Sequence, residues 1–253
     1  MKFSIITCTY NSEKFIRENI NSVKNQTFED FEHIFIDAFS KDGTMEILQK
    51  YQEKFPNKVS IFQSSPKGIA NAMNKGIEKA NGEYIIHLHA DDSIYDAAVL
   101  NDVSNFIDKN KNPDWIYGKA NFININTHKS LIIPHRNIYH KISFWLLLLT
   151  NYIPHQSVFI KKETFNNHGN FNENYKNSMD YDLWLRFAKN KVSSKFFNRT
   201  ICNFFIHPDS QSSKGGNNSA TEGINIHKKY ISSKLLRTIL AIIRKINSKR
   251  KFL

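Results

Sequence analysis

Cysteine is scarce in this sequence, whose 253 residues include only Cys8 and Cys202. Two isolated cysteines are too few for a disulfide framework or for a cysteine-based metal cluster. We therefore expect both to be reduced thiols in the core of an intracellular protein.

Long apolar runs are also missing, and the longest one, Phe144–Leu149, is far too short to cross a bilayer. The N-terminus leads directly into the apolar segment Phe3–Ile6, without the basic leader, long apolar stretch and cleavage site of a secretory signal. The sequence predicts a protein of the cytoplasm, either free or at the inner face of the cytoplasmic membrane.

Acidic residues are absent from the last part of the chain. No Asp or Glu follows Glu222, whereas nine Lys and Arg residues do, and these carry most of the formal net charge of +12. A basic tail on a nearly balanced body indicates a local anionic partner such as a membrane surface, and we expect no nucleic acid partner.

The same tail carries an apolar stripe. Ser210–Ser219 is rich in Ser, Gly and Asn and predicts a flexible loop. Beyond it, apolar residues recur every three or four positions, at Ile231, Leu235, Ile239, Ile242 and Ile246. We predict a basic amphipathic C-terminal helix within 216–253, whose stripe either packs on the main domain or docks on anionic lipid through residues 224–251.

The first half of the chain alternates short apolar runs with amphipathic stretches, which predicts an α/β fold with a Rossmann-like, mainly parallel (mixed) sheet flanked by helices. Strands are expected at 2–7, 31–37, 58–63, 83–89 and 114–118, and helices at 12–25, 44–54, 69–80 and 96–109. The second half is less regular. It predicts strand structure within 119–133, a helix carrying Trp145, a strand at 157–161, a helix from Asp180 and strands through Phe205.

Polar side chains follow the strands of this predicted sheet, at Thr9, Tyr10, Asp37, Asp91 and Asp92. Ligands of open α/β sheets bind beyond the carboxyl ends of the strands. Two adjacent carboxylates repel each other, and a divalent cation such as Mg²⁺ or Mn²⁺ offsets that repulsion. A turn or helix cap is the alternative for an Asp-Asp pair, but its place at the sheet edge favours a metal site.

Other candidates have a plain structural alternative. Tyr10 stacks on a nucleobase or simply packs, and Lys67 approaches phosphate or is solvated. His207 follows a late apolar strand, where an imidazole suits Mn²⁺ or is an ordinary core residue. For Asp42, which precedes a glycine and a helix, we favour a turn and capping role. Asp182 and Arg186 have the spacing of an ion pair on one helix.

The order and spacing of several motifs resemble those of family 2 glycosyltransferases over about residues 3–210. They are Ser4–Asn11, Asp37–Thr44, Lys67–Ile69 with Ala72–Gly76, His89–Asp92, His155–Ser157 and Met179–Arg186. Each motif is weak alone, but the series is specific. The resemblance implies a GT-A nucleotide-diphospho-sugar transferase fold, a nucleotide-diphosphate sugar donor, a divalent metal and inversion at the anomeric carbon.

The resemblance also implies roles for single residues. Thr9, Tyr10 and Asp37 would hold the nucleoside, Asp91 the ribose or donor sugar, and Asp92 the metal. The remaining roles are Lys67 and Asn71 on the donor side, His155 on the acceptor side, His207 as a further metal ligand and Asp180 as catalytic base. The sequence departs from the usual pattern at Cys8, Ala38–Phe39, Ala70 and Asn71.

We therefore predict an inverting glycosyltransferase of the bacterial surface-polysaccharide type. It would move a sugar from a nucleotide diphosphate, expected to be UDP, to a glycan or lipid-linked saccharide. The catalytic domain would span 1–215, with 1–118 binding the nucleotide sugar and 119–215 the acceptor. The alternatives are a metal-dependent nucleotidyltransferase on a similar sheet, for which a glycine-rich phosphate loop is lacking, and a non-catalytic nucleotide-sugar-binding module.

Overall fold

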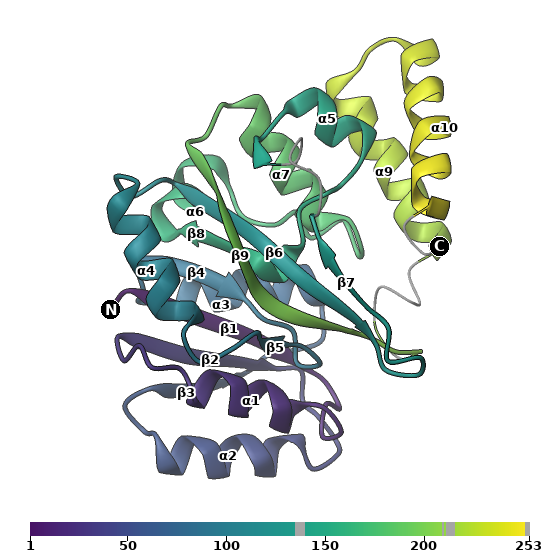
Figure 1. Cartoon of the computed structure of the whole chain (residues 1–253). Coiled ribbons are helices and arrows are strands. Elements are labelled where there is room, and N and C mark those ends of the chain that lie inside the picture. The colour runs from purple at the N-terminus through teal and green to yellow at the C-terminus, as the bar shows by residue number, and fades with distance from the viewer. Residues whose placement is uncertain (135–139, 209, 211–215, 251–253) are drawn as a thin grey trace.

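The computed structural model describes residues 1–134, 140–208, 210 and 216–250 of the chain. They form one mixed sheet with helices on both of its faces (Figure 1). The predicted α/β architecture is confirmed. None of the described helices combines the length and the apolar character that a bilayer crossing requires.

The first half of the chain is a regular alternation of strands and helices. Its elements are β1 (Phe3–Thr9), α1 (Ile16–Lys24), β2 (Phe31–Asp37), α2 (Thr44–Lys54), β3 (Val59–Gln63), α3 (Ile69–Lys79) and β4 (Tyr84–His87). The strands lie in the order β3-β2-β1-β4 and all their pairings are parallel. The carboxyl ends of these four strands therefore share one edge of the sheet.

The second half completes the sheet in a mixed manner. Its elements are β5 (Ser93–Ile94), α4 (Val99–Lys109), β6 (Trp115–Asn124), β7 (Ser130–Ile133), α5 (Phe144–Leu149), η2 (His155–Ser157), β8 (Val158–Lys161), α6 (Lys162–His168), α7 (Met179–Lys189) and β9 (Ser194–Ile206). The order continues β4-β8-β6-β9-β5, with β7 on β6. β8 runs antiparallel to β4 and β6, whereas β9 runs parallel to β6.

Alternation of side chains along the strands divides the core. Ile6, Ile34 and Ile85 face α3 and α7 on one side of the sheet, whereas Ile5 and Phe35 face the side that α1, α2 and α4 cover. Full burial of each such side chain contributes about 1.5–3 kcal/mol to folding.

Helix α3 approaches β1 very closely. A Cβ atom added at Gly76 would lie 2.3 Å from Cγ2 of Ile6, so only glycine fits this point of the helix without a shift of the packing.

Both cysteines are free thiols, with Cys202 buried and Cys8 half-buried. Burial raises the pKa of the Cys8 thiol to about 12 and that of Cys202 well above its usual value. Cys202 therefore lies in the core as expected, whereas Cys8 is only partly buried.

The tail differs from its prediction, because it forms two helices, α9 (Gly216–Tyr230) and α10 (Lys234–Arg250). Helix α9 already begins within the predicted loop, whose residues 211–215 lie outside the described part of the chain. The break has a local cause: the Ser233 hydroxyl accepts the amide hydrogen of Leu236 at 3.3 Å and caps α10. The division into 1–215 and 216–253 stays a prediction, since its boundary falls in the undescribed segment.

Candidate active site

The ends of β1 and β2 form a polar cluster around Asp37. The parallel register places Thr9 beside Asp37, and the Thr9 hydroxyl donates to Asp37 Oδ1 at 2.9 Å. The amide and hydroxyl of Ser40 donate to the same carboxylate at 3.0 and 2.6 Å. The next residue, Tyr10, is 60% exposed, so its ring is accessible beside this cluster. The structure thus brings together the three residues predicted to hold the nucleoside.

Hydrogen bonds connect the loop that follows β1 with the loop that follows β2. Asn11 adopts a positive φ of 49°, its amide donates to the Ser40 hydroxyl, and its side-chain oxygen accepts from the Lys41 amide at 2.8 Å. Asp42 accepts from the amide and hydroxyl of Thr44 at 3.1 and 2.6 Å, which agrees with its predicted role in the turn, whereas the N-cap position of α2 is Gly43.

Beyond β4, the two adjacent aspartates have different surroundings. Asp92 is 1% exposed, and its carboxylate accepts from Gln156 Nε2 at 2.8 Å and from the Phe205 amide at 3.1 Å. Burial, followed by the negative charge of Asp91, raises the pKa of Asp92 well above its usual value. The Asp91 side chain is 26% exposed. Asp91 is therefore partly accessible to solvent, whereas Asp92 is buried.

His207 lies against the aspartate pair, where it contacts Asp91. Its Nε2 atom lies 2.9 Å from Asp91 Oδ2, and its ring stacks on Phe15 with centroids 4.3 Å apart. Nδ1 is buried and has no partner among the described residues. The assignment of Asp92 and His207 as metal ligands stays a prediction, and each oxygen of Asp92 accepts one hydrogen bond, from Phe205 or from Gln156.

The pair of Asp91 and His207 fits a divalent cation. A carboxylate oxygen and a neutral imidazole nitrogen both suit Mn²⁺. In the described part of the chain, no group of three or more His, Cys, Asp and Glu side chains could hold a metal. Two protein ligands agree with the usual Mg²⁺ or Mn²⁺ site of a nucleotide enzyme, where phosphate oxygens and water complete the coordination.

Asp180 lies in the first turn of α7. Its Oδ1 atom accepts from the Tyr181 amide at 2.6 Å, and its Oδ2 atom is 3.5 Å from Asn151 Nδ2. Asn151 and Gln156 belong to one short segment, and Gln156 reaches Asp92. One segment therefore connects the predicted base with the aspartate pair.

His155, in the same segment, has unused hydrogen-bonding capacity. Its ring centroid lies 5.3 Å from that of His89 and 5.7 Å from that of His87. Neither ring nitrogen has a partner among the described residues. Burial, with smaller contributions from His89 and His87, lowers the pKa of His155 well below 6.5. His155 is thus a neutral imidazole, and its predicted place on the acceptor side stays a prediction.

The donor-side residues of α3 contact a glutamate that the sequence did not reveal. Asn71 and Asn74 donate to the two carboxylate oxygens of Glu173, each at 2.9 Å. Lys67 is exposed just before Gly68, whose φ of 98° starts the helix. Within the described residues, no hydrogen bond joins Lys67 or Asn71 to Asp37 or to the aspartate pair. Their donor contacts stay predictions.

Glu222 is another residue that sequence reasoning missed. From α9, its carboxylate accepts the amide hydrogens of Lys176, Asn177 and Ser178 at 2.7, 3.0 and 2.9 Å. These three residues lead directly into α7 and Asp180. Its position as the last acidic residue of the chain is the one feature that could have drawn attention to it.

Helix α7 is tied to its surroundings by Asp182, which lies 3.5 Å from Arg186 and 2.9 Å from Lys229 of α9. The predicted ion pair between Asp182 and Arg186 is confirmed. The guanidinium also donates to the carbonyl oxygens of His168 and Asn170, each at 2.8 Å.

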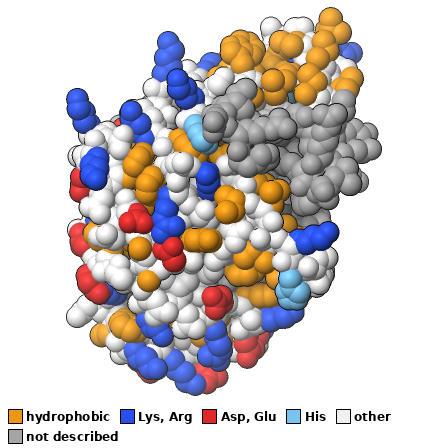
Figure 2. Space-filling model, in the orientation of Figure 1, with side chains coloured by type: hydrophobic (Ala, Val, Ile, Leu, Met, Phe, Trp, Pro, Cys, Tyr) orange, Lys and Arg blue, Asp and Glu red, His pale blue; other side chains and the backbone are white. Residues whose placement is uncertain are grey.

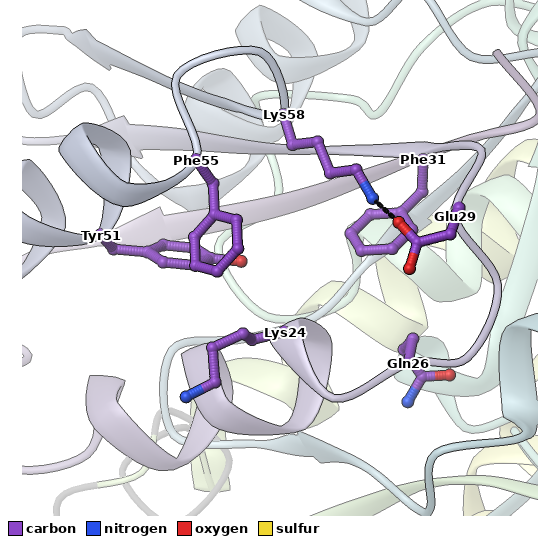
Figure 3. A pocket seen from close by; sticks show the side chains of 7 residues that line it. All are labelled: Lys24, Gln26, Glu29, Phe31, Tyr51, Phe55 and Lys58. Carbon is purple, nitrogen blue, oxygen red and sulfur yellow. Dashed lines mark hydrogen bonds and ion pairs between the residues drawn. The ribbon is translucent and has the colours of Figure 1, made fainter.

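A separate hollow of about 70 Å³ lies at the amino end of β2 (Figure 3). Lys58 closes it by an ion pair with Glu29 and lies 4.8 Å from the ring centroid of Phe31. This hollow is small and lies at the opposite end of β2 from Asp37. It is therefore not the candidate active site.

Comparisons with known proteins agree with this geometry. The model of the family "Glycosyl transferase family 2" matches residues 4–169. A PGL/p-HBAD biosynthesis glycosyltransferase of Mycobacterium bovis is 30% identical over 190 residues, which are 74% of this chain and 70% of the relative. The poly(ribitol-phosphate) beta-N-acetylglucosaminyltransferase TarS of Staphylococcus aureus is 39% identical over 111 residues, 43% of this chain and 19% of TarS.

Solved structures show the same fold. S. aureus TarS 1-349 in complex with UDP-GlcNAc has a TM-score of 0.73 at 22% identity, covering 89% of this chain and 64% of that one. The mannosyltransferase PcManGT of Pyrobaculum calidifontis, in complex with GDP-Man and Mn²⁺, has a TM-score of 0.68 at 16% identity, covering 92% of this chain and 64% of that one. The chain thus spans slightly less than two thirds of each neighbour, and the predicted GT-A fold is confirmed.

A glycosyltransferase is therefore favoured over a nucleotidyltransferase and over a non-catalytic module. The matched residues include both strand ends around Asp37, the aspartate pair and the segment with His155 and Gln156. The chain belongs to glycosyl transferase family 2 and is a sugar-transferring enzyme.

Proposed function

We propose that this protein is an inverting, metal-dependent glycosyltransferase that moves one sugar from UDP to a hydroxyl of a glycan or lipid-linked saccharide. The contact of Asp91 with His207, at the same sheet edge as the Thr9–Asp37 cluster, carries the proposal. UDP is supported by TarS, whose structure holds UDP-GlcNAc. Mn²⁺ is supported by PcManGT, whose structure holds GDP-Man and Mn²⁺.

Asp91 Oδ2 and His207 Nε2 would hold the divalent ion, Mn²⁺ or Mg²⁺. When bound, such an ion stabilises the negative charge that develops on the leaving diphosphate. Asp92 has a different task in this arrangement. By accepting the amide hydrogen of Phe205, it fixes the end of β9 and so the position of His207 two residues later.

The Thr9–Asp37 cluster would bind the nucleoside. Asp37 already accepts three hydrogen bonds, and a carboxylate has about four acceptor sites. The remaining site would accept one bond from a ribose hydroxyl or a base N–H, which requires that the completely buried Asp37 becomes accessible when the nucleoside binds. The exposed ring of Tyr10 offers a surface on which the base can stack.

Asp180 would act as the general base. It takes the proton of the acceptor hydroxyl while that oxygen attacks the anomeric carbon from the face opposite the diphosphate. The new carbon–oxygen bond forms as the bond to the diphosphate breaks, and the nucleoside diphosphate leaves with the electron pair. Inversion follows from this single displacement. The place of His155 on the acceptor side is part of this proposal, although both of its ring nitrogens are buried and would need to become accessible when the acceptor binds.

The acceptor class is supported by the names of the relatives. One belongs to PGL/p-HBAD biosynthesis, and the other is named for poly(ribitol-phosphate). We therefore place this protein in the assembly of surface glycans or glycolipids.

A donor screen tests the proposal. The melting temperature of the purified protein is measured with Mn²⁺ and UDP-GlcNAc, UDP-glucose or GDP-mannose, and the nucleotide product is identified. We expect at least one UDP sugar to stabilise the protein and to release UDP. Indifference to every UDP sugar would contradict the proposal, and release of pyrophosphate would indicate a nucleotidyltransferase.

A further inference from the structure

Helices α5 and α10 pack against each other and expose large apolar side chains. Trp145 of α5 is 65% exposed, and Leu235, Ile239 and Ile242 of α10 are 72%, 43% and 55% exposed. We call these four residues the α5–α10 surface. Figure 2 shows hydrophobic side chains gathered over the end of the molecule where α5 and α10 lie.

The exposed face of α10 is a continuous one. Positions 235, 239 and 242 follow the i, i+4, i+7 spacing that aligns side chains along one side of a helix. The inward side is provided by Leu240, which is 5% exposed and shares a core cluster with Leu147 of α5. Of the described members of the predicted stripe, Ile231 is buried in the core, whereas Leu235, Ile239 and Ile242 are exposed.

The charged residues of the tail after Glu222 are all basic. Neither α5 nor any residue after Glu222 is acidic. Lys141, before α5, and Lys228 and Lys234, at the ends of the tail helices, are all exposed. An apolar face bordered by cations matches an anionic lipid surface, where side chains enter the acyl boundary and lysines meet headgroups. Two copies of the chain joined face to face would bring these cations together at a cost.

We propose that the α5–α10 surface binds this protein to anionic lipid bilayers, with Trp145 at the interface and the outward face of α10 inserted. Tryptophan suits this position because its ring is apolar and its N–H is polar. Binding to the bilayer needs no sugar donor, so it can be tested independently of catalysis. It places the enzyme where a lipid-linked acceptor of the proposed function would be found.

Tryptophan fluorescence offers a direct readout. The chain has three tryptophans, and Trp115 and Trp184 are completely buried. A spectral change on adding vesicles therefore reports Trp145. With vesicles of phosphatidylglycerol and phosphatidylcholine we expect a blue shift and co-sedimentation, both weakened by salt. With pure phosphatidylcholine, we expect binding at least about tenfold weaker because the cations lose their partners.

Matched variants distinguish binding through the α5–α10 surface from non-specific binding through any exposed apolar residue. The triple variant Leu235→Ser, Ile239→Ser, Ile242→Ser should lose vesicle binding at least tenfold while keeping its UDP-sugar turnover on a soluble acceptor. The control Leu131→Ser, Ile132→Ser removes two other exposed apolar residues, 45% and 40% exposed, from β7 and should bind vesicles normally.

Three outcomes would overturn the proposal: wild type that ignores anionic vesicles, a triple variant that binds them normally, or a wild-type dimer that the triple variant abolishes without any vesicle binding. Circular dichroism of each variant checks that α10 has remained helical. A wild-type protein that binds anionic vesicles but turns over no UDP sugar would instead count against the proposed function.

Discussion

His207 Nε2 lies 2.9 Å from Asp91 Oδ2, although 116 residues separate them in the chain. The contact depends on the neighbouring aspartate. Asp92 binds the backbone of β9 at Phe205, just before His207, so two adjacent carboxylates engage the same strand end in different ways. One is used for structure, and the other remains open to solvent and ligand.

This arrangement predicts that Asp91→Asn and His207→Ala each weaken Mn²⁺ binding by at least roughly 10–100-fold, the loss typical of removing a group that only supports a ligand, because each removes one of two protein ligands. Calorimetric titration of Mn²⁺ in the presence of UDP measures the loss. Asp92→Asn, which preserves size and an acceptor oxygen for Phe205, should bind Mn²⁺ nearly as well as wild type. The reverse pattern, with Asp92→Asn impaired and Asp91→Asn normal, would restore the assignment made from the sequence.

Replacement of the proposed base should separate binding from chemistry. We expect Asp180→Asn to lower kcat by roughly 10²–10⁴-fold, because the amide cannot accept the proton of the acceptor hydroxyl. The dissociation constant of the UDP sugar should stay within about twofold of wild type, since Asp180 makes no proposed contact with the donor. Glu163→Gln, on the exposed side of α6, serves as control. Unchanged turnover would remove Asp180 from this role.

The sequence predicted the regular part of this structure well. β2 and α2 were predicted to the residue, because their apolar patterns are clear and turn residues border them on both sides. The Thr9–Asp37 contact also follows from the sequence, because parallel strands bring their carboxyl ends to one edge of the sheet.

Tertiary contacts decided what the sequence left open. Which of two adjacent aspartates faces the ligand depends on Gln156 and Phe205, 64 and 113 residues away from Asp92. No local pattern contains that information. Likewise, periodicity identified an apolar stripe in the tail, but not that Leu240 points inward while Leu235 and Ile239 point outward.

The Glu222 contact predicts an effect on catalysis from outside the site. Glu222→Gln replaces a carboxylate that accepts three amide hydrogens with a group that can accept only through one oxygen. We expect a loss of about 1–3 kcal/mol in the free energy of unfolding. Because the turn before Asp180 loosens, kcat should fall while the donor dissociation constant stays constant.

The control for Glu222 is again Glu163→Gln, which removes an exposed carboxylate from α6. The pH profile of kcat adds a second readout, since a displaced Asp180 should titrate at a different pH. If Glu222→Gln lowers the melting temperature but leaves kcat and its pH profile unchanged, Glu222 only stabilises the fold.

His33 predicts how stability depends on pH. Its ring on β2 is completely buried, 3.0 Å from the Thr7 hydroxyl, and burial lowers its pKa from 6.5 to about 3. Between these two values the unfolded chain binds a proton that the folded protein excludes. The free energy of unfolding must therefore fall as the pH drops below 6.5, by about 2 kcal/mol from this residue between pH 7 and pH 5.

Urea unfolding of wild type and His33→Gln at pH 7, 6 and 5 measures this contribution. The glutamine variant cannot titrate in this range, so its free energy of unfolding should fall less steeply than that of wild type. The stability of the variant at pH 7 does not affect the comparison. Only the slope of the unfolding free energy against pH reports the proton taken up by His33 on unfolding. His87 has a pKa lowered to about 3 by burial as well, so part of the slope should remain in the variant. Equal slopes for the two proteins would show that His33 takes up its proton alike in the folded and the unfolded state, so that burial does not lower its pKa.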